Sequence, residues 1–292
     1  MNAAIKLETA KRRRLFRSEE LVGQSIRRTD VQPWAFRSMA GFTQAVLDPQ
    51  FPCTFAAPGF WRGFYRYAFL PDARTLPAAE ELAATLDEYL AWLKTVPPGD
   101  EPYAVLIAFI EPVTGLNEHE YRANFEQLLQ RANVHDQAPW PVHVPRDANH
   151  RESTFCFGGR ELFVNANTPA HLHRRSRNLG ASLTLVIQPR DAFDKIASGK
   201  LREGIRARIP KFDGIPASPE IGAFGDDRNR EFNGYFLSDD NDEAQRRFEA
   251  TKVCPFLAAT ERTKAALSRC PYHRALRAIH HIKNYIRNLF KK

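Results

Sequence analysis

Hydrophobic and polar positions along the chain follow two different periods. In three stretches the apolar residues recur every three or four positions, which is the spacing of one face of a helix. These stretches are residues 35–47, residues 77–94 and a segment that starts at Asn117. Asn117 and Glu120 also have the spacing of a capping box, so the third helix is expected to begin there.

Short apolar runs of strand length separate and follow these predicted helices. An aromatic run at residues 61–70 and a continuous apolar run at 103–110 come first. Residues 154–157 and 161–164 then alternate on either side of Gly158-Gly159, a pair of glycines typical of a tight β-hairpin turn. A further run at residues 183–187 can join the same sheet. The pattern predicts an α+β fold: a central, largely antiparallel sheet with flanking helices, in a single main domain.

Beyond the last predicted strand the pattern becomes less regular. A helix is expected at residues 190–208, with interruptions at Gly199 and Gly204 and an end at Pro210. Residues 211–242 then form a long stretch rich in proline and glycine, which predicts an ordered loop. A loop of this length is uncommon unless it covers something, so we interpret it as a wall or lid of a site.

Both ends of the chain differ in composition from its centre. Residues 1–30 are basic and polar, which predicts an N-terminal arm outside the core, with one short helix at 18–27. Residues 31–242 form the predicted main domain. Residues 243–292 are predicted to form a helical C-terminal extension that packs on that domain. Its helices are expected at residues 241–253 and 271–290.

Composition narrows the class of protein. The chain has 292 residues, 43% of them hydrophobic and 26% charged, the balance of an ordinary globular protein. No uninterrupted apolar run of membrane-spanning length and no secretory signal is visible, so the cytoplasm is the expected compartment. The four cysteines form no CxxC pattern, which argues against a zinc ribbon, a thioredoxin-like site and covalently attached haem. Much of the net charge of +8 lies in the two ends of the chain and therefore says little about a central site.

Candidate chemistry concentrates in a basic segment between two predicted strands. Residues 168–177, TPAHLHRRSR, contain two histidines and three arginines. A loop held by a sheet and rich in imidazole and guanidinium groups can bind both a metal and anionic oxygens.

This segment and its neighbours carry a resemblance to a known family. The matching residues are Phe155-Cys156-Phe157-Gly158-Gly159, Leu162-Phe163-Val164-Asn165, Thr168-Pro169-Ala170-His171, Arg174-Arg175-Ser176-Arg177 and Gln188-Pro189-Arg190, with Phe51-Pro52-Cys53 further upstream. Together they resemble the core signature of the YqcI/YcgG family. The resemblance implies a haem-dependent N-oxygenase, a monooxygenase that hydroxylates or further oxidises an amino or guanidino nitrogen of a basic amino acid. It does not specify the substrate.

The same resemblance implies non-covalent haem b with His171 as the proximal ligand, at the family position before the arginines. The alternatives that remain open are His173, Cys53, Cys156 and the other histidines of the chain. Both cysteines are embedded in aromatic residues, where a buried thiol usually serves packing. Either thiolate would need a metal or a cation to offset its desolvation.

Guanidinium groups and aromatic rings complete the implied haem site. Arg174, Arg175 and Arg177 are suited to the two haem propionates, because a guanidinium donates two parallel hydrogen bonds to a carboxylate. Arg190 is suited to the same role or to the α-carboxylate of the substrate. The apolar walls are expected from Phe157, together with Phe155, Phe163 and Tyr65. The competing interpretations are a solvated basic turn and an ordinary sheet core.

A basic amino-acid substrate would need a carboxylate for its distal cation. Asp226 and Glu231, in the predicted lid, are preferred over four other candidates: Glu118, Glu120, Asp136 and Asp227. Neither a dinucleotide fingerprint nor a Walker A lysine is present, so electrons are expected from an external donor such as a ferredoxin or reductase, unless peroxide is the oxidant. We expect no membrane span and no specific nucleic acid as a partner, and a homodimer remains open.

Two other function classes stay under consideration. His171 and His173 with a carboxylate have the residue types of a non-haem iron or zinc site. Alternatively, residues 174–177 and the last helix would bind phosphate backbones in a basic nucleic-acid-binding module. The aromatic residues lie in apolar strand runs instead of interleaving with Lys and Arg, which disfavours this second alternative.

Overall fold

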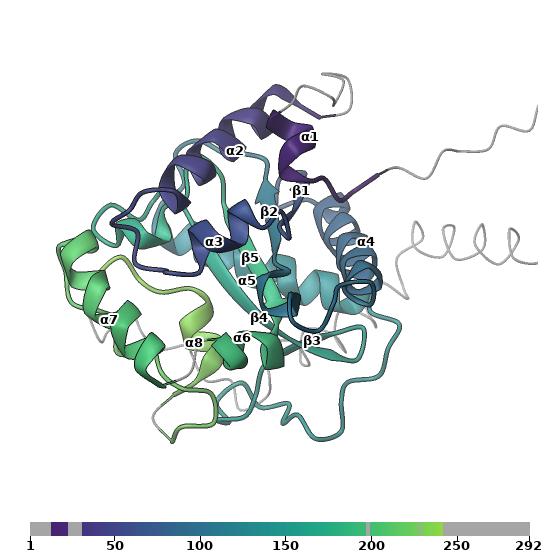
Figure 1. The fold of residues 1–292 in the computed structure, drawn as a ribbon. Coiled ribbons are helices and arrows are strands. Elements are labelled where there is room, and N and C mark those ends of the chain that lie inside the picture. Colours follow the sequence, from purple (N-terminus) through teal and green to yellow (C-terminus); the bar gives the residue numbers. More distant parts are fainter. Residues whose placement is uncertain (1–12, 23–30, 197–198, 228, 242–292) are drawn as a thin grey trace, which may run out of the picture.

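The computed structural model describes residues 13–22, 31–196, 199–227 and 229–241 (Figure 1). The helices are α1 Ser18–Val22, α2 Pro33–Val46, α3 Ala56–Trp61, α4 Leu76–Leu93, α5 Glu118–Val134, α6 Arg190–Ile196, α7 Gly199–Asp213 and α8 Glu231–Tyr235, with 3₁₀ turns η1 Glu101–Tyr103 and η2 Arg175–Arg177. The strands are β1 Arg66–Leu70, β2 Leu106–Ile110, β3 Phe155–Phe157, β4 Arg160–Asn167 and β5 Thr184–Pro189. The helices predicted at residues 241–253 and 271–290 lie outside the described residues, as do Cys254 and Cys270.

The strands form one sheet in the order β1-β2-β5-β4-β3. β1 and β2 run parallel, because α4 carries the chain back to the end of the sheet at which β1 begins. Every other pair of neighbouring strands is antiparallel. β3 and β4 form the predicted hairpin, in which Gly158 and Gly159 adopt φ values of 61° and 73° that favour glycine. The predicted α+β fold with a largely antiparallel sheet is confirmed.

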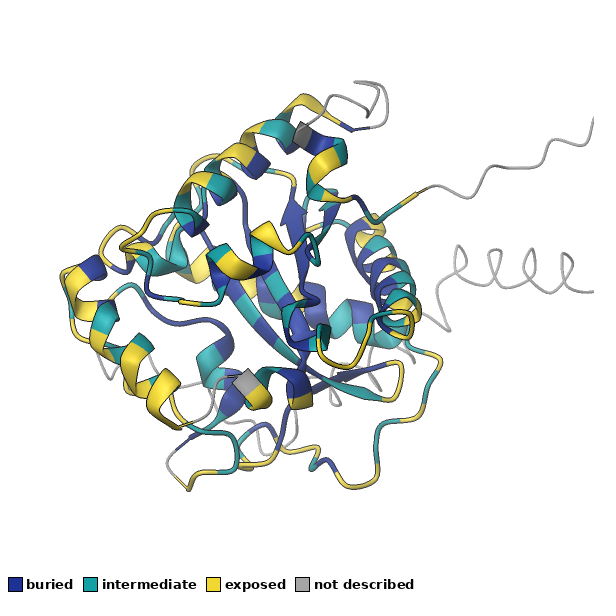
Figure 2. Cartoon of the chain, in the orientation of Figure 1, coloured by how far each residue is buried: buried dark blue, intermediate teal, exposed yellow. Residues whose placement is uncertain are grey.

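Side chains alternate across the sheet and define two different faces. Leu106, Ile187 and Val164 stand in register and point into the core under α4 and α5. Ile107, Val186 and Asn165 occupy the next positions and face the opposite side, which α2, α3 and α7 cover. Figure 2 shows the strands buried between these helices, whose outer surfaces are exposed. The second face, which includes polar residues, is where a site can form.

Several predicted elements need correction. Residues 56–61 are helical, so the predicted aromatic strand shortens to Arg66–Leu70; Trp61 is 73% exposed, which suits a surface helix and not a buried strand. α7 begins at Gly199 and continues through Gly204 and Pro210. The proline lies in the last helical turn, where one lost backbone hydrogen bond is tolerated. The predicted loop also contains the short helix α8. The capping box of Asn117 and Glu120 is present as predicted.

The N-terminal segment packs against the main body. Phe16 and Leu21 are buried in the core under α2, and Phe16 forms an antiparallel bridge with Tyr67 of β1. The described part of the predicted arm therefore extends the edge of the sheet and does not lie outside the core. None of the helices in the described ranges is long and apolar enough to cross a membrane.

Candidate active site

A cavity of about 240 Å³ lies between the second face of the sheet and helices α2, α3 and α7. Phe42 of α2, Tyr65 before β1 and Ile209 of α7 contribute to its mainly apolar walls. The Tyr65 hydroxyl donates a hydrogen bond to the Ala56 carbonyl oxygen over 2.9 Å, which fixes the orientation of this ring. The cavity therefore has rigid aromatic walls suited to an apolar ligand.

The sheet contributes a polar strip to the floor of the cavity. Phe163, Asn165 and Asn167 occupy alternate positions of β4, so all three face the cavity, and Gln188 of β5 joins them. Among the described residues, no Asp or Glu lines this cavity. A ligand here meets neutral amide groups and not the carboxylates that the sequence predicted.

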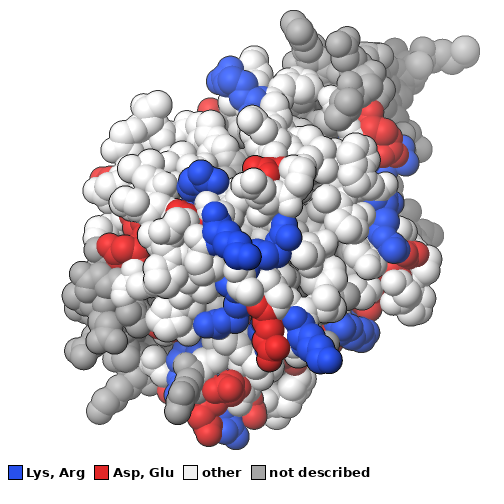
Figure 3. Space-filling model, turned by 60° about the vertical axis from the view of Figure 1, so that its left-hand side comes forward, with Lys and Arg blue, Asp and Glu red and all other residues white. Residues whose placement is uncertain are grey.

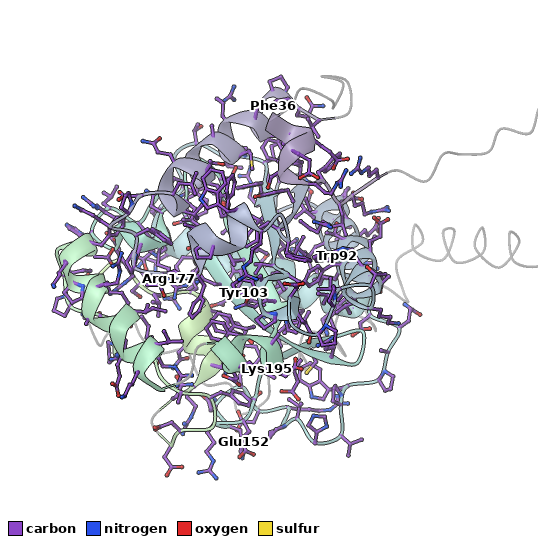
Figure 4. The ribbon with its side chains drawn as sticks, viewed as in Figure 1. Phe36, Trp92, Tyr103, Glu152, Arg177 and Lys195 are labelled. Carbon is purple, nitrogen blue, oxygen red and sulfur yellow. The ribbon has the colours of Figure 1, made fainter. Side chains whose placement is uncertain are left out.

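Arg177, one of the predicted propionate-binding residues, lies at the cavity. Figure 4 shows it between α7 and the sheet, with the cavity-lining Tyr103 nearer the centre of the view. Its Nη1 donates to the side-chain oxygen of Asn165. Burial, reinforced by the nearby charge of Arg174, lowers the pKa of Arg177 to about 9. The guanidinium remains largely protonated at neutral pH and gives the cavity a positive charge.

Arg174 supplies a second guanidinium at the same cavity and is only 1% exposed, whereas Arg177 is half-buried. Its Nε donates to the Ser238 carbonyl oxygen over 2.6 Å, and its Nη2 donates to the Asn241 side-chain oxygen over 2.7 Å. Its Nη1 is buried and has no hydrogen-bond partner among the residues described. A buried donor without an acceptor is costly, so this atom marks a place for an anionic group.

Cys53 also lines the cavity, in the segment that leads into α3. Burial raises the pKa of its thiol, whereas hydrogen bonds from the backbone amides of Phe55 and Ala56 and the charge of Arg177 oppose that rise. The Cys53 side chain thus lines the cavity and lies near groups that favour its negatively charged form.

The predicted haem ligand His171 lies elsewhere. It is fully buried, and its Nε2 donates to the Leu237 carbonyl oxygen over 2.7 Å. Its Nδ1 lies 3.1 Å from the Thr168 hydroxyl, which donates to it in this tautomer. Burial lowers the pKa of His171, which keeps the ring neutral. His171 does not line the cavity. This geometry does not favour the ring as a metal ligand.

The neighbouring residues of the basic segment also diverge. His173 is exposed, and its Nδ1 lies 2.9 Å from a carboxylate oxygen of Asp239. Arg175 is exposed and lies over the ring of Phe212. In the described part of the chain, no group of three or more His, Cys, Asp or Glu side chains is placed to hold a metal ion. Residues 171–177 therefore divide into side chains that point into the protein and side chains that point to solvent. They form neither a common basic face nor a two-histidine metal site.

The remaining predicted site residues do not meet at the cavity. Phe157 is fully buried in the core under α4 and α5. Arg190 and Glu231 form a buried ion pair with each other. Asp226 is exposed on the 211–242 segment. Of the residues considered in the sequence analysis, Arg174, Arg177 and the alternative ligand Cys53 line the cavity, together with the wall candidates Phe163 and Tyr65.

Sequence reasoning missed the amide strip of Asn165, Asn167 and Gln188. A signal was present, since Asn165 and Asn167 stand at alternate positions in residues 162–167, where all the other residues are apolar. Polar residues in such a row indicate a strand face that is not ordinary core.

The surface on the α7 side is basic. Figure 3 brings this side of the molecule forward and shows Lys and Arg side chains gathered near its middle, with acidic side chains below them. α7 contributes Lys200, Arg202, Arg206, Arg208 and Lys211. This charge favours the approach of anionic molecules to the side of the cavity that α7 covers.

Comparison with known proteins identifies the relatives of this chain. The model of the YqcI/YcgG family matches residues 42–256, more than half of the sequence. The chain belongs to the YqcI/YcgG family. The match includes the strands of the sheet, α7 and every residue of the cavity discussed above.

Three curated proteins are similar to this chain over most of their length. "Putative N(omega)-hydroxy-L-arginine synthase DcsA" of Streptomyces lavendulae is 32% identical over 81% of this chain and 89% of its own. "Uncharacterized protein YcgG" of Bacillus subtilis (strain 168) is 33% identical over 70% of this chain and 80% of its own. "Uncharacterized protein YqcI" of the same organism is 31% identical over 77% and 88%. No solved structure matches this chain.

Proposed function

We propose that this protein is a haem-dependent N-oxygenase that hydroxylates a guanidino or amino nitrogen of an arginine-like substrate. The observation that carries the proposal is the pairing of an apolar, aromatic cavity with two guanidinium groups, the buried Arg174 and the half-buried Arg177. The Streptomyces relative, whose name is "Putative N(omega)-hydroxy-L-arginine synthase DcsA", supports the same reaction class.

The cavity residues fit haem b in chemical character. The macrocycle is flat and apolar, and Tyr65, Phe163 and Ile209 offer apolar walls. Its two propionates need cationic donors, and Arg174 Nη1 is a buried donor without an acceptor among the described residues. Arg177 lies beside it with a retained positive charge. A guanidinium is the side chain best matched to a carboxylate, so we assign propionate binding to this pair.

Haem, when bound, supplies the dioxygen chemistry, and the protein supplies binding, orientation and exclusion of water. In the balanced reaction one atom of O₂ enters the N–H bond and the other leaves as water, with two electrons and two protons taken up. We assign those electrons to an external donor such as a ferredoxin or reductase. Asn165, Asn167 and Gln188 are suited to orient the substrate, because amide oxygens accept hydrogen bonds from guanidino N–H groups without adding a full negative charge.

The two alternative functions find less support. The non-haem alternative needs His171 and His173 on one metal, yet His171 hydrogen-bonds to Leu237 and His173 to Asp239. The nucleic-acid alternative needs exposed arginines in residues 174–177, yet Arg174 is buried.

Haem binding by the purified full chain tests the proposal directly. Titration with haemin should give a red-brown protein with a Soret band. The Arg177→Gln variant should bind haem about 10- to 100-fold more weakly, because a hydrogen bond to a charged group contributes about 1.5–3 kcal/mol. Arg175→Gln is the matched control and should bind normally, since Arg175 is exposed.

Turnover is then measured with reductant, oxygen and a panel of arginine, lysine and ornithine. At least one of these compounds should gain the mass of one oxygen atom. A chain that stays colourless with haemin would contradict the proposal. So would an Arg177→Gln variant that binds haem as tightly as Arg175→Gln does.

A further inference from the structure

We propose that Cys53, and not His171, supplies the axial ligand of haem in this cavity, as a thiolate. This inference rests on the proposed function and adds the identity of the iron-binding residue. It assigns the protein to the thiolate-ligated class of haem enzymes.

Position provides the first argument. Cys53 lines the cavity from the α3 side, whereas Asn165 and Gln188 line it from the sheet. The Cys53 side chain already forms part of the cavity wall in this structure. Cys156, the other cysteine in the described part of the chain, is buried on β3 away from the cavity, and its sulfur lies 3.7 Å from the Thr154 carbonyl oxygen.

The surroundings of the sulfur provide the second argument. The backbone amides of Phe55 and Ala56 and the charge of Arg177 each act to lower the pKa of the thiol. Burial outweighs these groups, so the pKa of the thiol stays above its ordinary value in the absence of a metal. A buried thiolate becomes favourable when a bound metal offsets its desolvation. At this place in the cavity wall a bound iron would supply the positive charge that such a thiolate needs.

Arg174 provides an independent indication of a ligand in the same cavity. Its side chain is 1% exposed, and Nη1 has no partner among the described residues, although Nε and Nη2 are both satisfied. This donor requires an anionic group in the cavity that Cys53 lines. A haem propionate meets that requirement while the sulfur meets the iron.

His171 lacks the same opportunity. Its Nε2 donates to Leu237 and its Nδ1 accepts from Thr168, so neither nitrogen is available without loss of a buried hydrogen bond. Ligation by His171 would therefore require the 237–239 segment to separate from residues 168–174. That segment is held by Arg174, which donates to Ser238 over 2.6 Å.

Absorption spectroscopy of the haem-loaded full chain separates the two ligands. The ferrous carbon monoxide complex of a thiolate-ligated haem absorbs at markedly longer wavelength than that of an imidazole-ligated haem. The wild type should give the thiolate-type spectrum, and Cys53→Ser should lose it and retain at least about 10-fold less haem. Cys156→Ala and His171→Asn are controls that should keep the thiolate-type spectrum.

The outcomes distinguish this inference from the proposed function. An imidazole-type spectrum in the wild type, or an unchanged thiolate-type spectrum in Cys53→Ser, would overturn the assignment of Cys53 while leaving haem dependence intact. A wild type without haem would overturn the proposed function itself. If Cys53→Ser does not fold, Cys53→His should still fold and show an imidazole-type spectrum, and a thiolate-type spectrum there would count against Cys53.

Discussion

Arg190 and Glu231 form an ion pair inside the protein, with Arg190 Nη1 2.7 Å from Glu231 Oε2 and both side chains no more than 4% exposed. The other carboxylate oxygen of Glu231 accepts hydrogen bonds from the hydroxyls of Thr154 and Tyr235, over 2.5 and 2.8 Å. These contacts connect α6 and α8 to the β3 strand region. Both residues were predicted at the active site, and the structure gives them a role in holding the sheet together with its helices.

Removal of one partner of this pair should destabilise the fold strongly. Glu231→Ala leaves the Arg190 guanidinium buried beside an empty site, and we expect a loss of about 3–5 kcal/mol in the free energy of unfolding. The double variant Arg190→Met with Glu231→Leu should lose much less, because an apolar pair removes both charges. Asp227→Ala is the control and should change stability by less than about 1 kcal/mol, because Asp227 pairs with Arg151 at the surface. Urea denaturation measures all three, and equal losses for the single and double variants would argue against the pair.

Glu231 should also make stability depend on pH. Burial raises its pKa from 4.5 to about 7, with Arg190, Thr154 and Tyr235 opposing the rise. Between pH 4.5 and about 7 the unfolded chain has lost this proton while the folded chain keeps it, so the contribution of Glu231 to stability falls as pH rises through this window. The difference in unfolding free energy between wild type and Glu231→Gln should shift by about 3 kcal/mol across the window and stay constant above it. A difference that does not vary with pH would show that Glu231 ionises normally.

His171 should contribute to stability and not to haem retention. His171→Ala removes the hydrogen bond to Leu237 and leaves a buried carbonyl oxygen without a donor, so we expect a loss of about 2–4 kcal/mol. The folded-state pKa lies below the ordinary value of 6.5, so the stability due to the neutral ring is complete above pH 6.5 and declines as pH falls below it. The alanine variant should lack this decline. Thermal or urea unfolding over a pH series measures both effects, and haem content measured in parallel should match the wild type.

The close approach of α2 to the β5 side of the sheet predicts an unusual substitution effect. A Cβ atom on Gly41 would lie 3.1 Å from the Cα of Gly180, a backbone atom that cannot rotate away as a side chain can. Alanine normally stabilises a helix by about 1 kcal/mol relative to glycine. Here Gly41→Ala should instead cost about 1–2 kcal/mol, because the backbones must separate. Gln44→Ala, at an exposed position of the same helix, should be neutral or stabilising. A more stable Gly41→Ala protein would contradict this packing.

The sequence by itself determined the elements whose signals are local. The apolar spacing of α4, the capping box of Asn117 and Glu120, and the glycine pair of the β3-β4 hairpin each predicted the observed structure. These features depend on side chains a few positions apart, so no knowledge of the rest of the chain is needed. The family signature likewise lies in the linear order of residues.

The tertiary structure alone decided which residues meet at the cavity. Arg174, Arg175 and Arg177 are almost adjacent in the sequence, yet the η2 turn directs two of them inward and one to solvent. Cys53, Asn165 and Ile209 are far apart in the sequence but line the same cavity. They do so because the sheet holds β4 opposite α3 and α7. Glu231 was predicted to bind substrate but instead pairs with Arg190, which lies 41 positions away in the chain. Only the packing of α6 against α8 brings these two side chains together. Contacts of this kind arise from long-range packing, which no local pattern encodes.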